Sequence, residues 1–344
     1  MKKLFLLVAG CCLLAQAAQA ADDTVRKVGG EQIKGTVKSL AKDKIVVEKS
    51  GKDETLKPFE VESIRFDDEP AKSVAIRSQI SNGGYENALK VLEQIDPATL
   101  ERAETKQEMQ YLKAYCNAQL ALGGGVDLAA AGKQMLDFLK ANPDSYHFYA
   151  ANELLGDMLV AAGKYENAVT YYKALADSPF DEYKMRAGVA LGRARVSEKK
   201  YPQAQQEFET ALDAAEKSAG PSAEATKQAA KIGLATCLAE TGKPEEGVKL
   251  TNEVLAKLPA EEVDLHARAY VAQGNCYRKM PDHAKAALIA FLHVDKLYFS
   301  NAQAHAEALW NLAPLFFEIG KQDRAAQVTQ LLKERYPNSP WAKL

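Results

Sequence analysis

The pattern of hydrophobic residues changes character once along the chain, near residue 70. Over residues 22–68, β-branched and aromatic residues stand in short alternating runs, separated by glycine, serine-glycine and proline. Runs of this kind with frequent turn signals favour a small, strongly bent sheet or barrel. From Pro70 onward the chain is alanine-rich, and helix-like stretches are separated by glycine or proline. That second pattern predicts one helix after another.

A bend and a turn can be located within residues 22–68. Residues 33–37 alternate between apolar and polar, and Gly35 permits a tight bend there. Lys49-Ser50-Gly51-Lys52 predicts a hairpin turn. The layout resembles the SH3-like or Sm-like small barrels, in which a stretch such as residues 58–64 forms a helical turn before the last strand. We expect Phe59 and Phe66 in the core of this domain, and the domain itself to cap the first repeat that follows.

Small residues recur in pairs twelve positions apart through the helical part of the chain. An apolar or aromatic residue follows the first member by three in most pairs, and in several a turn glycine follows by seven. Two antiparallel helices that approach closely need a small residue on each side of their crossing, and a glycine ends the first helix. The pairs are Gly156/Ala168, Gly192/Ala204, Ala235/Gly247, Gly274/Ala286 and Ala313/Ala325.

This spacing resembles the tetratricopeptide repeat (TPR), most plainly at Leu155-Gly156 and at residues 163–168. Two earlier hairpins are degenerate: Ile76/Ala88 keeps the spacing, and residues 101–143 are interrupted at Gly123–Gly125, which we expect to be a flexible link. The resemblance implies about seven hairpins over residues 71–342. The predicted fold class is therefore mainly α, a TPR-type helical-hairpin solenoid (an α-α superhelix) preceded by a small all-β barrel over residues 22–68.

The first twenty residues have the pattern of a secretory signal peptide. Lys2 and Lys3 precede an apolar run over residues 4–14, and Ala18-Gln19-Ala20 supplies a small-x-small cleavage site. We expect cleavage after Ala20 and export to the periplasm or cell envelope. An alternative is a lipoprotein cleavage box that would leave Cys11 as a lipidated N-terminus. The final residues 336–342 are similar to repeats of exported bacterial envelope proteins, which also favours export.

Composition excludes several classes of function. The chain has 344 residues with a formal net charge of −2, and this becomes −4 when Lys2 and Lys3 leave with the leader. Such a balanced charge predicts no binding of nucleic acid or of anionic membrane. No segment after the leader is apolar enough to span a bilayer. After cleavage three cysteines remain, and we expect them to be small buried residues without disulfides. They are Cys116, Cys237 and Cys276.

No catalytic motif, metal-ligand spacing or cofactor fingerprint is present, so we expect no enzyme activity, metal or cofactor. The resemblance implies instead a concave binding face, lined by the first helix of each hairpin. A carboxylate clamp is not expected, because Val271 stands where such clamps have lysine. The family's groove positions map onto Glu153, Asp157, Arg186, Arg193, Arg268, Asn275 and Trp310.

The sequence thus predicts a non-catalytic interaction scaffold of the cell envelope that binds a protein or peptide partner in this groove. Two alternatives stay open. One is a self-assembling structural protein, suggested by the aromatic residues Trp310, Phe316, Phe317 and Trp341 near the C-terminus. The other is an enzyme directed at the cell wall, with a site between the barrel and the solenoid. We expect Trp310 and Phe317, seven residues apart, to share a core-facing stripe.

Overall fold

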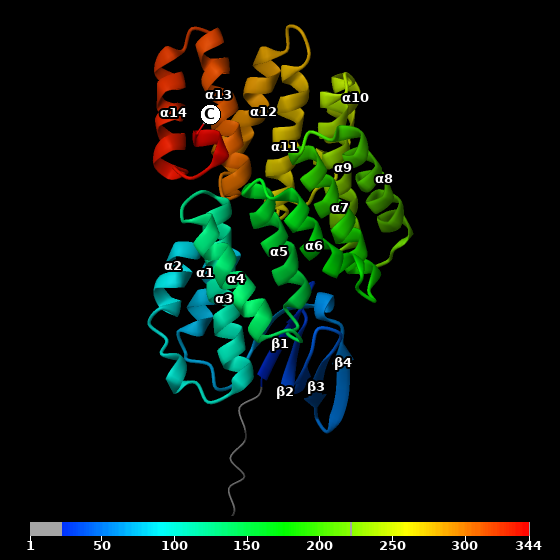
Figure 1. The fold of residues 1–344 in the computed structure, drawn as a ribbon, viewed down its shortest axis with the longest axis vertical. Coiled ribbons are helices and arrows are strands. Elements are labelled where there is room, and N and C mark those ends of the chain that lie inside the picture. The colour runs from blue at the N-terminus through cyan, green and yellow to red at the C-terminus, as the bar shows by residue number, and fades with distance from the viewer. Residues whose placement is uncertain (1–22, 221, 344) are drawn as a thin grey trace, which may run out of the picture.

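The fold is seen in a computed structural model that describes residues 23–220 and 222–343. The expected leader over residues 1–20 and the alternative lipid site at Cys11 lie outside the described residues. Figure 1 shows a small sheet at one end of the molecule and a curved array of helices beyond it. The predicted fold class, a mainly helical solenoid preceded by a small β domain, is confirmed.

Five short strands form one antiparallel sheet at the start of the described chain. Their order across the sheet is β4-β3-β2-β1-β5, so the first strand lies between the second and the last. Alternate side chains point to one face, where Val25, Ile33, Ile45 and Ile64 are almost fully buried. The strands are β1 (Asp23–Lys27), β2 (Gln32–Leu40), β3 (Ile45–Lys49), β4 (Lys52–Leu56) and β5 (Val61–Arg65).

The turns of the sheet follow the local sequence. Ser50 and Gly51 both have positive φ, 52° and 76°, which is the conformation of a two-residue turn matched to the twist of its strands. The predicted hairpin turn is therefore confirmed. A single 3-10 turn, η1 (Pro58–Glu60), precedes β5, as the barrel resemblance implied. Phe66 is buried in the core of the sheet, also as expected.

Fourteen α-helices follow within the described residues, and consecutive helices pack as seven antiparallel hairpins. This matches the number expected from the repeat spacing. The helices are α1 (Ser73–Ser81), α2 (Tyr85–Leu92), α3 (Ala103–Leu122), α4 (Leu128–Ala141), α5 (Phe148–Ala161), α6 (Tyr165–Ala176), α7 (Asp181–Ser197), α8 (Tyr201–Lys217), α9 (Ala223–Glu240), α10 (Pro244–Leu255), α11 (Val263–Arg278), α12 (Ala284–Leu297), α13 (Ala302–Glu318) and α14 (Gln322–Arg335).

Small residues lie where the two helices of a hairpin cross. A Cβ atom added to Gly192 of α7 would come within 2.6 Å of the Phe208 ring of α8. A Cβ atom added to Gly274 of α11 would come equally within 2.6 Å of the Phe291 ring of α12. These glycines, each the first member of a twelve-residue pair, thus lie where the two helices of a hairpin cross, and a large ring fills the space that each glycine leaves.

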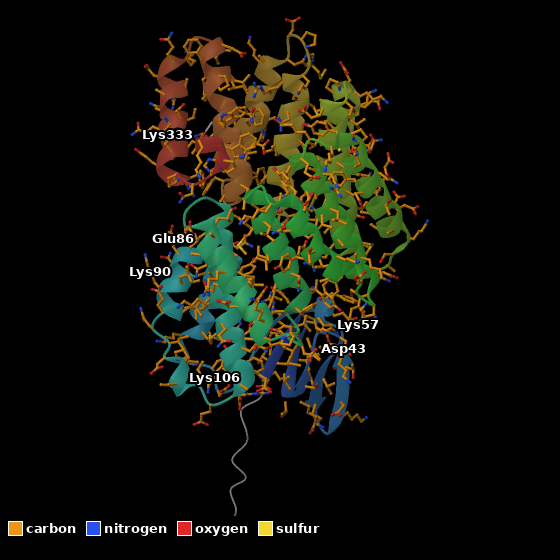
Figure 2. All side chains as sticks on the ribbon, in the orientation of Figure 1. Asp43, Lys57, Glu86, Lys90, Lys106 and Lys333 are labelled. Carbon is orange, nitrogen blue, oxygen red and sulfur yellow. The ribbon has the colours of Figure 1, made fainter. Side chains whose placement is uncertain are left out.

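The second helices carry much of the outer surface. Figure 2 shows Glu86 and Lys90 of α2 and Lys333 of α14 at the edge of the molecule, and all three are exposed. In α14 only Val328 and Leu332 are buried. The first helices of successive hairpins contact one another, as α3 with α5, α5 with α7, α7 with α9 and α9 with α11. We call the surface that these first helices form the inner face.

The C-terminal hairpin returns to the turn between α3 and α4, so the superhelix closes on itself. The backbone N–H of Asn338 donates to the carbonyl of Gly124 at 3.1 Å. A Cβ atom added to Gly124 would lie 2.6 Å from the backbone nitrogen of Ser339. Helix α13 also contacts α3 directly. The expectation of a flexible link at Gly123–Gly125 is therefore wrong, because this turn is packed against the end of the chain.

Candidate functional site

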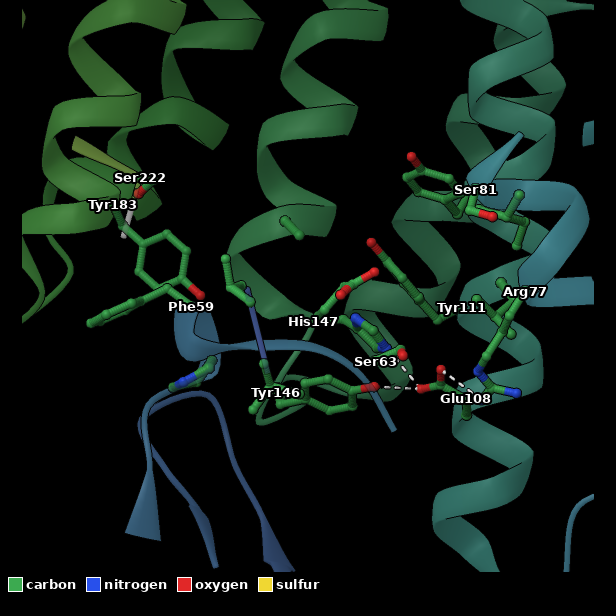
Figure 3. A pocket seen from close by; sticks show the side chains of 18 of the residues that line it. Phe59, Ser63, Arg77, Ser81, Glu108, Tyr111, Tyr146, His147, Tyr183 and Ser222 are labelled. Atoms are coloured by element: carbon green, nitrogen blue, oxygen red, sulfur yellow. Dashed lines mark hydrogen bonds and ion pairs between the residues drawn. The ribbon is translucent and has the colours of Figure 1, made fainter. Parts of the chain in front are cut away.

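A cavity of about 470 Å³ lies where the sheet meets the first helices of the early hairpins. We call it the junction pocket. Figure 3 shows η1 and the sheet on one side of it, with α3, α5 and α7 around the other. Its principal lining residues are Phe59, Glu108, Tyr111, Tyr115, His147, Ala150, Tyr183 and Arg186.

Aromatic rings form much of the pocket wall. The ring of Tyr111 stacks on His147 with centroids 3.5 Å apart. Phe59 meets Tyr183 edge-on at 6.0 Å, so it lies in this wall and not in the core of the sheet, where we expected it. Burial raises the pKa of both Tyr111 and Tyr183 above the usual value, so their hydroxyls stay protonated as hydrogen-bond donors.

A buried carboxylate, Glu108 of α3, anchors one corner of the pocket. It accepts hydrogen bonds from the Tyr146 hydroxyl at 2.7 Å and from Arg77 at 3.3 Å, and it pairs with His147 Nε2 at 2.8 Å. Burial opposes its charge, but His147 and Arg77 outweigh burial and hold the pKa of Glu108 below its ordinary value of 4.5. Glu108 is therefore ionised at neutral pH.

Arginine side chains join the sheet to the helices and so fix the shape of the pocket. Arg102 donates to both oxygens of the buried Asp23 carboxylate, at 2.9 and 3.0 Å, and to the carbonyl of Val37 at 2.9 Å. Arg77 of α1 donates to the carbonyl of Ile64 in β5 at 2.5 Å. The sheet also contributes to a pocket lined by α1, α3, α5 and α7. The sheet therefore borders several hairpins and not only the first repeat, which we had expected it to cap.

The predicted groove residues of α5 and α7 are brought together as ion pairs. Arg186 bonds to Glu153, and Arg193 bonds to Asp157 at 3.0 Å. Burial disfavours the charge on Arg193, but Asp157 and the neighbouring acidic groups outweigh it and raise the pKa of Arg193. The Tyr172 hydroxyl donates to Asp157 at 2.7 Å. These pairs brace successive first helices across the inner face.

The predicted residues of α11 are also paired within the protein. Arg268 bonds to Asp264, one turn earlier in the same helix, at 2.8 Å. Asn275 donates to Glu307 of α13 at 2.9 Å. Burial raises the pKa of Glu307, and the hydrogen bond from Asn275 only partly opposes this. The structure thus shows that Arg268 and Asn275 both bind a neighbouring side chain.

Trp310 of α13 packs against the end of the chain. Its ring lies 5.1 Å from that of Trp341, and the Arg278 guanidinium stands 5.8 Å from it. Trp341 therefore covers the face of the last hairpin. We expected Trp310 and Phe317 to share a stripe that faces the core. This is wrong for Phe317, which is 64% exposed.

Of the seven predicted residues, only Arg186 lines the junction pocket. Glu108, Tyr111 and His147 were not predicted from the sequence, because they lie in and after the degenerate hairpin, outside the clear repeats. One signal was present: Tyr111 and Tyr115 are four residues apart and share a face of one helix.

The cysteine expectation is confirmed for the part of the chain that the structure describes. Cys116, Cys237 and Cys276 are free and buried, and burial raises the pKa of each thiol to about 12. Across residues 23–343, apart from Pro221, no group of three His, Cys, Asp or Glu side chains is placed to hold a metal ion. No helix in the same described ranges combines the length and apolar character that crossing a membrane requires.

Comparison with known proteins identifies the repeats. Family models of the tetratricopeptide repeat match residues 117–182 and residues 307–339. The first match runs from within α3 through α6 to the start of α7, and the second runs from within α13 through α14 to Ser339. No protein with a curated description matches the sequence.

Three solved structures are similar to this chain at low identity. A tetratricopeptide repeat protein from Parabacteroides merdae is 15% identical, with a TM-score of 0.48, over 76% of this chain and 91% of that one. A Rap protein complexed with Competence and Sporulation Factor is 13% identical, with a TM-score of 0.54, over 76% and 73%. The apo form of RapI is 15% identical, with a TM-score of 0.44, over 78% and 76%. The chain is a TPR-like solenoid preceded by a five-stranded sheet.

Proposed function

We propose that this chain is an exported, non-catalytic scaffold of the cell envelope, which holds a peptide or protein partner against the inner face of its solenoid. The junction pocket is the observation that carries the proposal. It is concave, aromatic-walled and preformed, as ligand pockets in proteins usually are. TPR folds generally serve as interaction scaffolds, and a preformed surface loses little conformational entropy on binding.

The inner face has a further property that suits a scaffold. The ion pairs Arg186–Glu153 and Arg193–Asp157 hold neighbouring first helices in fixed positions. A structure with a similar fold, the Rap protein, is described as a complex with Competence and Sporulation Factor. We infer from the pocket and from this likeness that the partner of the present chain enters the inner face as well.

We also infer that the N-terminal sheet is an SH3-like barrel. The strand order β4-β3-β2-β1-β5 and the 3-10 turn before β5 support this assignment. In this protein the domain would serve as one wall of the junction pocket, since Phe59 and β5 both line it.

The Glu108–His147 pair is the feature of the pocket that most resembles acid–base machinery. Glu108 is ionised and already bound by Arg77, Tyr146 and His147. A general base must reach a substrate proton and accept it, and a carboxylate occupied in this way is poorly suited to that role. We therefore assign the pair to holding the pocket together.

Self-assembly is a second candidate, favoured by one observation. Phe317, near the end of α13, is 64% exposed, and Ile319, two residues later, is 38% exposed. Large apolar side chains exposed in one region can mark an interface. Sedimentation of wild type and Phe317→Ser over a range of concentrations tests this, because self-assembly predicts an oligomer that only the wild type forms.

Export has a direct test. The proposal expects the intact mass of protein from the periplasmic fraction to correspond to a chain that begins at Ala21. A lipidated chain that begins at Cys11, recovered with the membranes, would support the alternative. Full-length protein in the cytoplasmic fraction would refute export.

Partner binding is tested by photocrosslinking in cells. A photoreactive residue replaces Tyr115 at the pocket in one variant and Lys90 on the outer face in a matched control. The proposal expects a discrete crosslinked partner from position 115 that is absent from position 90. Equal crosslinking from both positions would refute the assignment to the inner face.

A further inference from the structure

The charged side chains around the junction pocket are already neutralised by neighbours. Arg186 is paired with Glu153, and Glu108 with Arg77. Glu62, where β5 borders the pocket, bonds to Arg26 at 2.9 Å. A ligand with a net charge would have to compete with these existing partners. The pocket is therefore electrostatically suited to a neutral group.

The wall that remains is aromatic with phenol hydroxyls. Phe59, Tyr111 and Tyr183 contribute rings, and the structure as described gives the Tyr111 and Tyr183 hydroxyls no hydrogen-bond partner. Figure 3 shows these two tyrosines on opposite sides of the cavity. Aromatic rings favour edge-to-face or offset contact with another ring, and a free phenol hydroxyl favours an acceptor such as a backbone carbonyl.

From the paired charges and the aromatic wall, we infer that the junction pocket binds a neutral aromatic side chain of the partner, such as tryptophan or tyrosine. The inference rests on the proposed function and specifies its chemistry. The ring packs among Phe59, Tyr111 and Tyr183, while the hydroxyls of Tyr111 and Tyr183 donate to carbonyl groups of the peptide that carries it. A volume of about 470 Å³ accommodates one such side chain with its flanking backbone.

A small wall residue offers a way to fill the pocket without removing any of its contacts. Ala150 lies in the first turn of α5 and lines the cavity. Ala130 occupies the equivalent third position of α4 and is exposed. Ala150→Phe therefore tests the pocket, and Ala130→Phe is its matched control for the cost of a large aromatic residue at that place in a helix.

The test titrates the full mature chain with N-acetyl-L-tryptophanamide, a neutral aromatic probe, by saturation-transfer NMR and calorimetry. We expect binding to the wild type and to Ala130→Phe, weakened at least about tenfold in Ala150→Phe. We expect less than about a twofold change between low and high salt, because no charge pair is formed. Circular dichroism confirms that both variants are folded.

Three results would overturn the inference: no binding to the folded wild type, equal binding to Ala150→Phe, or preference for the charged probe N-acetyl-L-tryptophan. The crosslinking experiment separates this failure from failure of the proposed function. A partner still crosslinked at position 115 would keep the scaffold function and reject only the aromatic anchor.

Discussion

Phe208 of α8 lies between two helices that both approach it through glycine. A Cβ atom added to Gly192 of α7 would lie 2.6, 2.7 and 2.8 Å from three atoms of its ring. A Cβ atom added to Gly233 of α9 would overlap the same ring from another helix. The ring is 1% exposed and has no open side into which it could move. Gly192→Ala therefore tests whether this close crossing determines the packing of the hairpins.

The expected magnitude comes from two opposing effects. Overpacking in a closed core costs about 1–3 kcal/mol. We place this site near the upper end of that range, because α7 and α9 both approach the Phe208 ring and leave it no room to move. The higher helix propensity of alanine stabilises the folded state by about 1 kcal/mol relative to glycine, which offsets part of this cost. We expect Gly192→Ala to lower the free energy of unfolding by about 2 kcal/mol.

The assay is urea unfolding followed by circular dichroism, with Gly132→Ala as the control. Gly132 also lies inside a helix, α4, but the nearest atom to an added Cβ is Leu155 Cδ1 at 3.9 Å. We expect this control to gain about 0.5–1 kcal/mol. In a Phe208→Leu background, the cost of Gly192→Ala should shrink. If Gly192→Ala and Gly132→Ala shift the midpoint in the same direction, the close crossing at Gly192 does not determine the packing of the hairpins.

Three further predictions concern the sheet contact, pH and the cysteines. Arg102→Met leaves the buried Asp23 carboxylate without its arginine. We expect the free energy of unfolding, measured with denaturant, to fall by about 3 kcal/mol. The control is Arg26→Met at the exposed Arg26–Glu62 pair, and an equal or larger loss in the control would contradict this. The pKa of Glu108 is lower in the folded protein than its ordinary value of 4.5. This shift stabilises the folded state at pH values above 4.5, and the stabilisation is lost as the pH falls through the lower pKa of the folded protein. Glu108→Gln should therefore be less stable than wild type at pH 7 but lose less stability on acidification, and parallel melting curves from pH 7 to about pH 3 would contradict this. Because burial raises the pKa of Cys116, Cys237 and Cys276 to about 12, iodoacetamide should modify them only after unfolding, as mass spectrometry can show.

The repeat architecture could be predicted from the sequence because its signals are local. A pair such as Gly192/Ala204 indicates a crossing of two helices that lie within about 30 residues of one another in the chain. Ser50 and Gly51, which both have positive φ, indicate a hairpin turn within a stretch of four residues. The groove positions transferred from the TPR resemblance also fell on first helices, as Arg186 and Asn275 show. Whether these residues bind a partner is the question that the proposed experiments address.

The sequence by itself determined the elements: a small sheet, seven helical hairpins and the small residues at their crossings. The tertiary structure alone decided which distant side chains meet. Glu108 joins Arg77 and His147 across three elements, and Gly124 receives the end of the chain. These contacts depend on the accumulated curvature of several stacked hairpins, so no local spacing encodes them. The junction pocket exists for the same reason, since its walls come from segments far apart in the chain that only stacking brings together.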